Sequence, residues 1–594
     1  MNLPTPQARI AALQEQLRQT EVAAWITPTA DPHQSEYVAE HWQDRAWLSG
    51  FSGSAGTLVV TQTQAGLWTD PRYHLRAESE LAGSGIGLHR SGLAGVPSYA
   101  EWLADNLTDG DQLGFNAERL SLVEVERLKR AFGRKQIEFF TRSDLAGSQW
   151  TERPPLPPGP LRLYDEHFAG ESRREKLARI RAEMVKAGVD GYLLTGLDDI
   201  AWTFNIRGND VAYNPVVIAY AFISLHETIL FVHSGKVDPA SRAALTSDGV
   251  SLLDYPAIAP FWHTLPAHSR VLIDPAKTSY HFLATAPEGY HLHRAQSIAA
   301  RLKAVKNPEE VEGFRRAHLR DGVALVRWLI WLEEAVPTES HTEITLGEKL
   351  AELRSQGDLY RGESFGTITG YGPNSAVGHY SPRPETTPIV RPAGLLLSDS
   401  GGQYEDGTTD ITRTLALGPP SAEERQVYTT VLKCHIRLAT ARFPQGTTGS
   451  QLDALAREFL WREGWNCRHG IGHGVGHFLN VHEGLQRFST NNRVTLVPGM
   501  VTSNEPGVYF AGKFGVRLEN LLLCVADSST DFGDFYCFET LGLCPFDLQL
   551  VDSSRLDGRE IEWLNNYHRR VYDSLAHLLN PVERVWLQNA TRTL

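Results

Sequence analysis

The stretch "DSGGQYEDGTTDITRTLAL", residues 399–417, joins two strand-like runs through a segment rich in turn-forming residues. Asp399 follows the apolar run 395–397, and Asp410 opens the second run. Glycine and aspartate between two such runs favour a tight reversal of the chain. The pattern therefore predicts a hairpin-like unit that brings Asp399 and Asp410 together.

Two more acidic residues occupy strand-like segments further along the chain. Glu505 precedes Pro506, which favours an extended backbone at the glutamate. Glu519 lies within "GVRLENLLLCV", where alternation predicts one strand with Arg517 and Glu519 on the same face. Burying unpaired carboxylates costs several kcal/mol or more. Two divalent cations, which such sites hold roughly 3.5–4 Å apart, would supply the missing counter-charge.

A histidine-rich stretch, "HGIGHGVGHFLNVHEG", covers residues 469–484. His469, His473 and His477 follow one another at intervals of four, which on a helix would line one side and form a zinc site. Four glycines alternate with them, however, and each costs a helix about 1 kcal/mol relative to alanine. The residues alone leave open which of these histidines bind a metal.

Other catalytic motifs are weaker. The surroundings of Ser400, "LSDSGG", resemble those of a nucleophilic serine, but no matching histidine and aspartate context is found elsewhere. The zinc motif H-E-x-x-H is absent from the sequence; His482-Glu483 comes closest and ends at Gly484. No glycine-rich phosphate-binding loop follows a strand-like run, which argues against a nucleotide site.

Composition narrows the class of protein further. The chain has 594 residues and a net charge of −13, which suggests two to four domains and disfavours nucleic acid as a partner. No apolar run reaches the 18 or so residues of a membrane span, and the N-terminus lacks the pattern of a signal peptide. The five cysteines form no C-x-x-C pair. Reduced core thiols in a cytoplasmic protein are therefore expected.

The chain divides at two places. "TERPPLPPGP", residues 151–160, reads as an extended linker, and a softer boundary lies near Ser297, before the helix start Asn307-Pro308-Glu309-Glu310. Segments starting at Arg9 and Arg179 both run from an amphipathic helix through a turn to an apolar strand, which suggests a duplicated α/β unit. We predict domains at 1–153, 161–297 and 298–594. The last ends in an extension from about residue 535, with a strand and an amphipathic helix and no assigned chemistry.

Several motifs together resemble one family. "DSGGQYEDGTTDITRT", "HGIGHGVGHFLNVHEG", "NEPGVYF", "GVRLEN" and "GYGPNSAVGHYSP" are similar to the signature of the aminopeptidase P group of pita-bread metallopeptidases. "WLSGFSGSAGTLVVT", "LWTDPRYHLRAE" and "NIRGNDVAYNP" extend the resemblance to the front of the chain. The long, three-domain cytosolic form is the best match. It implies a fold of mixed α/β and α+β class: two creatinase-like N-terminal α/β domains followed by a C-terminal pita-bread catalytic domain.

The resemblance also implies a metal centre. Its five ligand positions fall on Asp399, Asp410, His473, Glu505 and Glu519, which would bind two divalent ions, with Asp410 and Glu519 bridging them. This hard ligand set suits Mn²⁺, with Zn²⁺ or Co²⁺ as other candidates. His379, His469 and His482 match accessory histidines near the substrate. His477 falls where relatives often have a small residue, and we interpret it as an ordinary loop histidine. The alternating glycines are expected to allow close backbone approach and φ values that other residues do not tolerate.

The implied activity is that of a metal-dependent exopeptidase, which releases the N-terminal residue from peptides with proline in the second position. A water bridging the two ions would attack the Xaa-Pro peptide bond, with Glu505 as general base. His379 and His482 would hydrogen-bond the substrate and the tetrahedral intermediate. Arg517 is expected to pair with a ligand aspartate, and Tyr509 is a weaker candidate for the same outer ring.

A homodimer acting on peptides, with neither nucleic acid nor membrane as partner, is the expected assembly. In this family the N-terminal domain of a neighbouring subunit often closes the cleft. Arg45 and Trp47 in "DRAWLSGF" are the candidates for that contact, with a purely structural role for the arginine as the alternative. Three other functions stay open: a prolidase that cuts Xaa-Pro dipeptides, a metal-free creatinase-type hydrolase, and a catalytically inactive interaction module.

Overall fold

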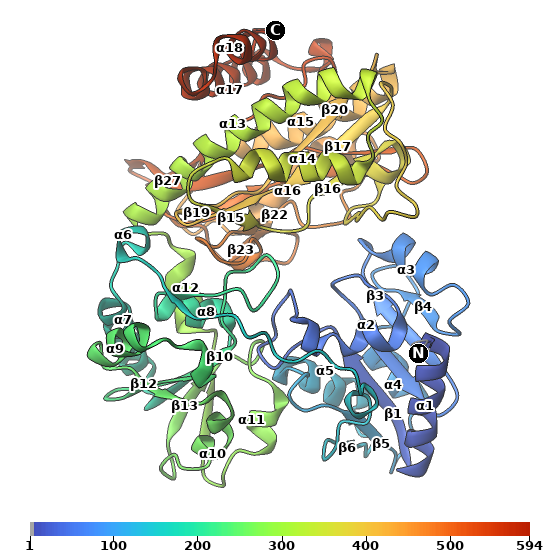
Figure 1. Cartoon of the computed structure of the whole chain (residues 1–594), viewed down its shortest axis with the longest axis vertical. Helices are drawn as coiled ribbons and strands as arrows, with labels where there is room; N and C mark the ends of the chain where they lie inside the picture. Colours follow the sequence, from blue (N-terminus) through green and yellow to red (C-terminus); the bar gives the residue numbers. More distant parts are fainter. Residues whose placement is uncertain (1–4) are drawn as a thin grey trace. The chain divides into compact units, whose positions relative to one another are not determined.

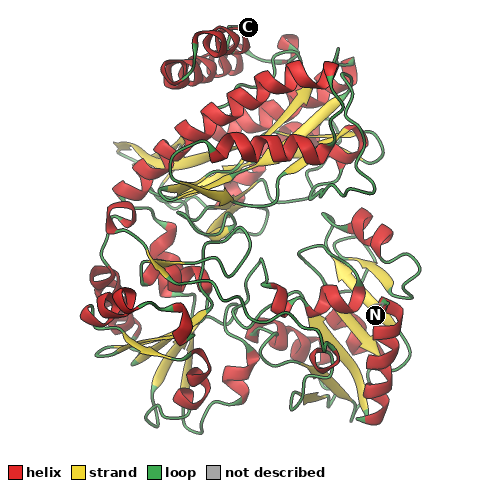
Figure 2. Cartoon of the chain, in the orientation of Figure 1, coloured by secondary structure: helices red, strands yellow, loops and turns green. Residues whose placement is uncertain are grey.

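The computed structural model describes residues 5–594, which form two compact units. Unit 1 comprises Met1–Tyr164 and Glu171–Ala299, and unit 2 comprises Asp165–Gly170 and Ala300–Leu594. Figure 1 follows the chain through its elements, and Figure 2 separates the helices from the strands. Among the described residues, no helix combines the length and apolarity needed to cross a bilayer.

Unit 1 contains two six-stranded sheets of the same topology. The first has the order β4-β3-β2-β1-β5-β6 and the second β12-β11-β10-β8-β13-β14. In each, the first strand pairs antiparallel with the hairpin that follows it and parallel with the next strand after that. The strands are β1 (Val22–Pro28), β2 (Thr57–Thr61), β3 (Ala65–Thr69), β4 (Gly87–Arg90), β5 (Gln112–Phe115), β6 (Glu138–Phe140), β8 (Gly191–Leu194), β10 (Ala219–Ser224), β11 (Thr228–Val232), β12 (Ser251–Leu253), β13 (Arg270–Ile273) and β14 (His291–Arg294).

This shared strand order supports the predicted duplication. The two opening helices, α1 (Pro6–Gln19) and α7 (Arg173–Ala187), begin at side-chain caps: Thr5 caps the first, and Ser172 forms a capping box with Glu175 in the second. The other helices of unit 1 are α2 (Asp44–Ser49), α3 (His74–Glu80), α4 (Tyr99–Asn106), α5 (Leu122–Phe132), α8 (Leu197–Thr203), α9 (Pro239–Ser247), α10 (Ile258–Trp262) and α11 (Tyr280–Ala284). The short strands β7 (Arg162–Leu163) and β9 (Ile206–Arg207) pair with each other.

The linker and the helix start near residue 307 are confirmed. Residues 153–161 contain no helix or strand. The helix α12 (Ile298–Ala304) crosses the boundary between the two units. Asn307 then caps α13 (Pro308–Thr338) through a capping box with Glu310. The finer division of the chain at 1–153, 161–297 and 298–594 stays a prediction.

Unit 2 contains two three-stranded sheets, a six-stranded sheet and a two-stranded ribbon. The three-stranded sheets have the orders β16-β17-β20 and β15-β18-β19, and the larger sheet has the order β21-β28-β27-β24-β22-β23. Their strands are β15 (Tyr360–Glu363), β16 (Ile368–Tyr371), β17 (Leu395–Ser400), β18 (Gly402–Tyr404), β19 (Gly407–Thr408), β20 (Ile411–Ala416), β21 (Phe443–Pro444), β22 (Gly472–Gly474), β23 (Glu483–Phe488), β24 (Val501–Asn504), β27 (Asn520–Thr530) and β28 (Gly533–Thr540).

Two pairs of helices pack against these strands. Trp328 on α13 and Leu346 on α14 (Glu343–Ser355) share a core with Leu396 and Ile411, and Figure 1 shows both helices running across the strands β16, β17 and β20. The second pair, α15 (Ala422–Ala439) and α16 (Gly449–Arg462), contributes to a larger core that includes Leu522 of β27. The strands that carry the polar residues are therefore supported by two buried apolar cores.

The predicted pairing of Asp399 and Asp410 is confirmed. Strand β17 pairs antiparallel with β20, and Asp399 lies opposite Thr412, two residues after Asp410. The residues between them form β18 and β19, which pair with each other in a separate sheet. The hairpin-like unit thus includes a small second hairpin.

The prediction of one continuous strand through Glu519 is wrong. The chain leaves the large sheet after β24, forms the ribbon β25 (Gly507–Phe510) and β26 (Phe514–Arg517), and returns as β27. Glu505 lies at the first crossing and Glu519 at the second. Leu518 N donates to the Pro506 carbonyl at 3.3 Å, and Glu519 N donates to the Thr412 carbonyl at 3.0 Å. These bonds turn the backbone out of the sheet, which periodicity alone could not reveal.

Arg413 of β20, which is 2% exposed, connects the strands to the C-terminal extension. Its guanidinium donates to the carbonyls of Glu519 at 2.6 Å and Cys544 at 2.7 Å and to the Tyr567 hydroxyl at 2.9 Å. Tyr567 belongs to α17 (Gly558–Leu575), which α18 (Pro581–Ala590) follows. The five cysteines, all within the described residues, are free; four are buried and Cys537 is half-buried.

Replacing Arg413 with lysine should destabilise unit 2. A lysine keeps the charge but cannot reach several acceptors at once, so buried carbonyls lose their partner, at a cost of about 3 kcal/mol. We expect a clear fall in the thermal unfolding midpoint for Arg413→Lys and none for the control Arg559→Lys, an exposed arginine on α17. Equal midpoints for the two variants would contradict this role of Arg413.

Candidate metal centre

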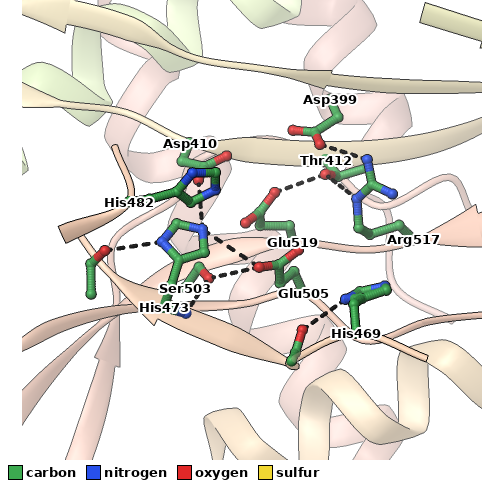
Figure 3. A network of polar contacts seen from close by, with 12 residues as sticks. Asp399, Asp410, Thr412, His469, His473, His482, Ser503, Glu505, Arg517 and Glu519 are labelled. Carbon is green, nitrogen blue, oxygen red and sulfur yellow. Dashed lines mark hydrogen bonds and ion pairs between the residues drawn. The ribbon is translucent and has the colours of Figure 1, made fainter. Parts of the chain in front are cut away.

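The five expected ligand residues come from five separate places in unit 2. Asp399 lies in β17 and His473 in β22, whereas Asp410, Glu505 and Glu519 lie where strands break or begin. Figure 3 shows their side chains directed toward one another. Ligand atoms of Asp410, His473 and Glu519 all lie within 4.8 Å of one another, which is a geometry that could hold a metal ion. The structure therefore brings together the residues that the sequence singled out.

His473 is oriented for this cluster by backbone contacts. Its Nδ1 lies 2.9 Å from the carbonyl of Gly474, to which it donates, so Nε2 is left to face the carboxylates. Nε2 lies 3.4 Å from Asp410 Oδ2 and 3.5 Å from Glu505 Oε1. The Ser503 hydroxyl donates to Glu505 Oε1 at 3.2 Å and accepts from the His473 backbone N–H at 3.0 Å. Ser503 thus fixes both neighbours.

The glycines around His473 allow close packing rather than unusual dihedral angles. A Cβ on Gly472 would lie 1.9 Å from the Ser503 carbonyl oxygen, and one on Gly474 would lie 2.6 Å from the Glu483 carbonyl oxygen. Neither glycine has a positive φ, nor do Gly470 and Gly476. The expected close approach is thus confirmed, but the expected special φ values are wrong at these four positions.

Glu519 is held from the opposite strand. The Thr412 hydroxyl donates to Glu519 Oε2 at 2.7 Å, and Arg517 Nε donates to the same hydroxyl at 3.2 Å. The sequence reasoning missed Thr412, Ser503 and Arg413. Thr412 could have been suspected, because it is two residues from Asp410 within the quoted motif and lies opposite Asp399.

Asp399 forms an ion pair with Arg517, but only one of its two carboxylate oxygens has a hydrogen-bond partner. Arg517 Nη2 donates to Asp399 Oδ2 at 2.5 Å, whereas Asp399 Oδ1 is buried and has no hydrogen-bond partner. Buried polar atoms are nearly always paired, so an unpaired carboxylate oxygen on a residue with other acids nearby fits a cation. The expected pairing of Arg517 with a ligand aspartate is found.

The electrostatics of the cluster also indicate missing positive charge. Burial and the negative charges of Asp410 and Glu505 raise the pKa of Asp399 to about 6, despite Arg517. Burial and the same neighbours raise the pKa of Glu519 well above its ordinary value. Burial lowers the pKa of His473, but its contacts with Asp410 and Glu505 outweigh this and raise it to about 9. Without cations the cluster retains protons, which metal ions would replace. The donor set fits divalent ions.

A chain of hydrogen bonds links Asp399 to an accessory histidine. Arg517 Nη1 donates to the Tyr509 hydroxyl at 2.7 Å, and that hydroxyl lies 2.9 Å from His469 Nε2. His469 Nδ1 lies 2.7 Å from the carbonyl of Gly470, so Nε2 can accept from Tyr509. Tyr509 and His469 thus contact the carboxylates only indirectly, through Arg517.

His482 lies directly beside the cluster, with its ring centroid 4.3 Å from that of His473 and the two rings nearly perpendicular. His379 belongs to a loop that reaches the same region, since Arg517 Nη1 lies 3.5 Å from the carbonyl of the preceding Gly378. His477 is in a loop, as expected, but it is 2% exposed and its Nε2 lies 3.0 Å from the Asp406 carbonyl oxygen. It is therefore a buried, bonded histidine.

Next to His482, three charged side chains are buried together. Lys303 and Lys306 contact the two carboxylate oxygens of Glu483 at 2.8 and 2.5 Å. All three side chains are at most 5% exposed. The segment that joins the two units is thereby fixed to the first residue of β23.

Arg45 does not have the free guanidinium that substrate binding would need. It is 3% exposed; its guanidinium donates to the carbonyls of Phe51 and Gly53 in its own domain and to the Thr29 hydroxyl at 2.9 Å. These bonds support the alternative of a structural arginine, and the substrate contact stays a prediction. Trp47 stacks on Trp150 with centroids 5.4 Å apart.

Comparison with known proteins agrees with this geometry. The model of metallopeptidase family M24 matches residues 312–526, and that of the C-terminal region of peptidase M24 matches 534–594. Models of the creatinase/prolidase N-terminal domain match 9–143 and 152–310. A probable Xaa-Pro aminopeptidase P from Coprinopsis cinerea is 39% identical, covering 98% of this chain and 97% of its own. The chain belongs to the Xaa-Pro aminopeptidase P family of M24 metallopeptidases.

Members of the Xaa-Pro aminopeptidase P family resemble this chain over its full length. Aminopeptidase P2 from Arabidopsis thaliana is 39% identical, covering 96% of this chain and 86% of its own. Among solved structures, an X-prolyl aminopeptidase from Caenorhabditis elegans, described as a cytosolic enzyme with a di-nuclear active site, is 34% identical with a TM-score of 0.94. The match covers all of both chains. The fold and the family expected from the sequence are confirmed.

The raised pKa of Asp399 predicts how metal ions stabilise the protein at different pH. Because the folded, metal-free state holds this proton more tightly than the unfolded chain, the site's contribution to stability falls as pH rises from about 4 to about 6. Metal binding requires the ionised carboxylate. The shift in thermal midpoint between Mn²⁺ and chelator should therefore grow across that interval.

The matched variant is Asp399→Asn, which keeps the shape and removes the ionisation. Its Mn²⁺-induced shift should be smaller and should vary less between pH 4 and 6. A wild-type shift that stays constant or shrinks with rising pH would contradict this account of the carboxylate cluster.

Proposed function

We propose that this protein is a metalloaminopeptidase that releases the N-terminal residue from peptides with proline in the second position. The observation that carries the proposal is the convergence of four carboxylates and one imidazole, with an unpaired buried oxygen on Asp399, in a chain that matches Xaa-Pro aminopeptidases over its full length. A catalytically inactive interaction module or a metal-free hydrolase would have no use for this costly cluster.

Two divalent cations would be held by Asp399, Asp410, His473, Glu505 and Glu519. Mn²⁺ suits the predominantly carboxylate set, and Zn²⁺ or Co²⁺ are the other candidates. When bound, the ions neutralise the carboxylates, polarise the substrate carbonyl and lower the pKa of water. The remaining chemistry belongs to the protein's own side chains.

Glu505 is the proposed general base. Its Oε1 is fixed by Ser503 and faces His473 Nε2, so the carboxylate is oriented to take a proton from the attacking water and return it to the leaving proline nitrogen. The C–O bond forms first and gives the tetrahedral intermediate; the C–N bond then breaks as the proline nitrogen receives the proton, so the transfer balances the reaction.

His482 and His379 are proposed to hydrogen-bond the substrate and the oxygen that becomes negative in the tetrahedral intermediate. His482 supports this role by its position against His473. His469 is the third proposed substrate-facing histidine, and Tyr509 and Arg517 fix both it and Asp399. Loss of these hydrogen bonds would leave the ligand Asp399 in place but less firmly oriented.

We also propose a cytoplasmic homodimer. The cytosolic description of the similar enzyme from C. elegans supports the location.

The full-length match to aminopeptidases, with both N-terminal domains present, favours longer peptides over the dipeptides that a prolidase cleaves.

The test is hydrolysis of an Xaa-Pro-Xaa tripeptide by protein stripped with chelator and then given Mn²⁺. We expect metal-dependent release of the first residue, and a loss of at least about a thousandfold in kcat/KM for Asp410→Ala, which removes a carboxylate from the proposed ligand set. An Xaa-Pro dipeptide runs alongside.

Cleavage of the dipeptide alone would make the protein a prolidase instead. Failure to cleave either peptide by folded, Mn²⁺-loaded protein would contradict the proposed activity altogether.

A further inference from the structure

The loop between His473 and His482 is buried although it has no regular structure. Residues 475–481 are all buried and connect β22 to β23. Buried irregular backbone is uncommon, because its polar groups must find partners without a strand or helix to supply them. The contacts that hold this loop are therefore informative about its function.

Two side-chain bonds fasten the loop to the hairpin β18–β19. His477 Nε2 lies 3.0 Å from the Asp406 carbonyl oxygen, and because a carbonyl only accepts, this nitrogen carries the proton. From the hairpin, Gln403 Nε2 donates to the Leu479 carbonyl at 2.6 Å. The Thr408 hydroxyl donates to Gln403 Oε1 at 2.8 Å, which fixes the orientation of the amide.

The hairpin is in turn fixed to α13. The Asp406 carboxylate is 1% exposed and pairs with Arg316 at 3.1 Å and with Arg320. On the same helix, a Cβ at Gly313 would lie 2.2 Å from the Asp406 carbonyl oxygen and 3.0 Å from His477 Nε2. The missing side chain of Gly313 leaves room for both partners of the bond.

The loop residue between the two fasteners is in an unfavourable conformation. Phe478 has a φ of +49°, in the left-handed region that residues with a Cβ rarely adopt. Such a backbone persists where its neighbours hold it on both sides. Here His477 and Leu479, the two immediate neighbours, are the residues bonded to the hairpin.

The two bonds, His477 to Asp406 and Gln403 to Leu479, join two elements of the catalytic centre. The hairpin β18–β19 leads through Thr409 to Asp410, and the loop leads to His482, whose ring lies 4.3 Å from that of His473, which in turn contacts Asp410. We propose that His477 and Gln403 are positioning residues that hold His482 against Asp410 and His473. The inference rests on the proposed aminopeptidase activity and assigns to His477 a part that neither a ligand nor an ordinary loop histidine would have.

The experiment compares full-length, Mn²⁺-loaded variants on an Xaa-Pro-Xaa tripeptide. His477→Phe keeps a ring but cannot donate, and Gln403→Met keeps the length but cannot bond. Each should lower kcat about tenfold or more, with KM changed less than about threefold, because a small misplacement of a catalytic group mainly costs rate. Bound Mn²⁺ per chain should stay at the wild-type value, and His477→Gln, which restores an N–H donor, should recover most of the activity. His577→Phe, at an exposed position in the C-terminal extension, is the control.

A double-mutant cycle separates positioning from general structural damage. If His477 acts through His482, adding His477→Phe to His482→Asn should lower kcat by less than about twofold further. Wild-type kcat in His477→Phe, full additivity in the cycle, or loss of bound Mn²⁺ would each overturn the inference while wild-type protein still cleaves the tripeptide. Absence of wild-type cleavage would overturn the proposed function and the inference with it.

Discussion

Crowding of buried carboxylates is the constraint on which the catalytic unit depends. Asp399, Asp410, Glu505 and Glu519 meet at a buried site, where burial and, after it, their mutual repulsion raise the pKa of Asp399 and of Glu519. The guanidinium of Arg517 lies near them, and it forms an ion pair with Asp399. The rest of the unit resists this repulsion: helices pack on the strands, Arg413 ties the C-terminal extension to Glu519, and hydroxyls of Thr412 and Ser503 fix individual oxygens.

The positions of these acids within the strands explain how they can converge. A residue inside a regular strand points to one face at a fixed height, and its neighbours' hydrogen bonds fix its backbone. Glu505 and Glu519 instead lie where the chain crosses between the six-stranded sheet and the ribbon β25–β26, opposite each other across the crossing. Asp410 similarly precedes β20. The breaks free these side chains from the alternation of the strand and direct them to a common centre.

Much of the architecture could be predicted from apolar periodicity and turn residues, because these are local signals. The four acidic residues stood out as polar side chains in strand-like runs, whereas the choice of His473 as the fifth expected ligand came from the family resemblance. The pairing of Asp399 with the strand after Asp410 followed from turn chemistry alone. The strand break at Glu519 could not be predicted, since "GVRLENLLLCV" alternates as a continuous strand would and the break depends on bonds to Pro506 and Thr412. The contacts of Arg45 could not be predicted for a similar reason, because only the fold shows that its guanidinium bonds backbone carbonyls.

The buried contact of Lys303 and Lys306 with Glu483 bears on how the polypeptide can be shortened. Matches to the M24 model begin at residue 312, and α13 begins at Pro308, so either point would be a natural place to start a recombinant catalytic fragment. A fragment cut there would lack both lysines and leave the Glu483 carboxylate buried without a counter-ion, immediately beside His482. A catalytic fragment that keeps this contact therefore has to begin before Lys303, within the stretch that the model of the creatinase/prolidase N-terminal domain matches.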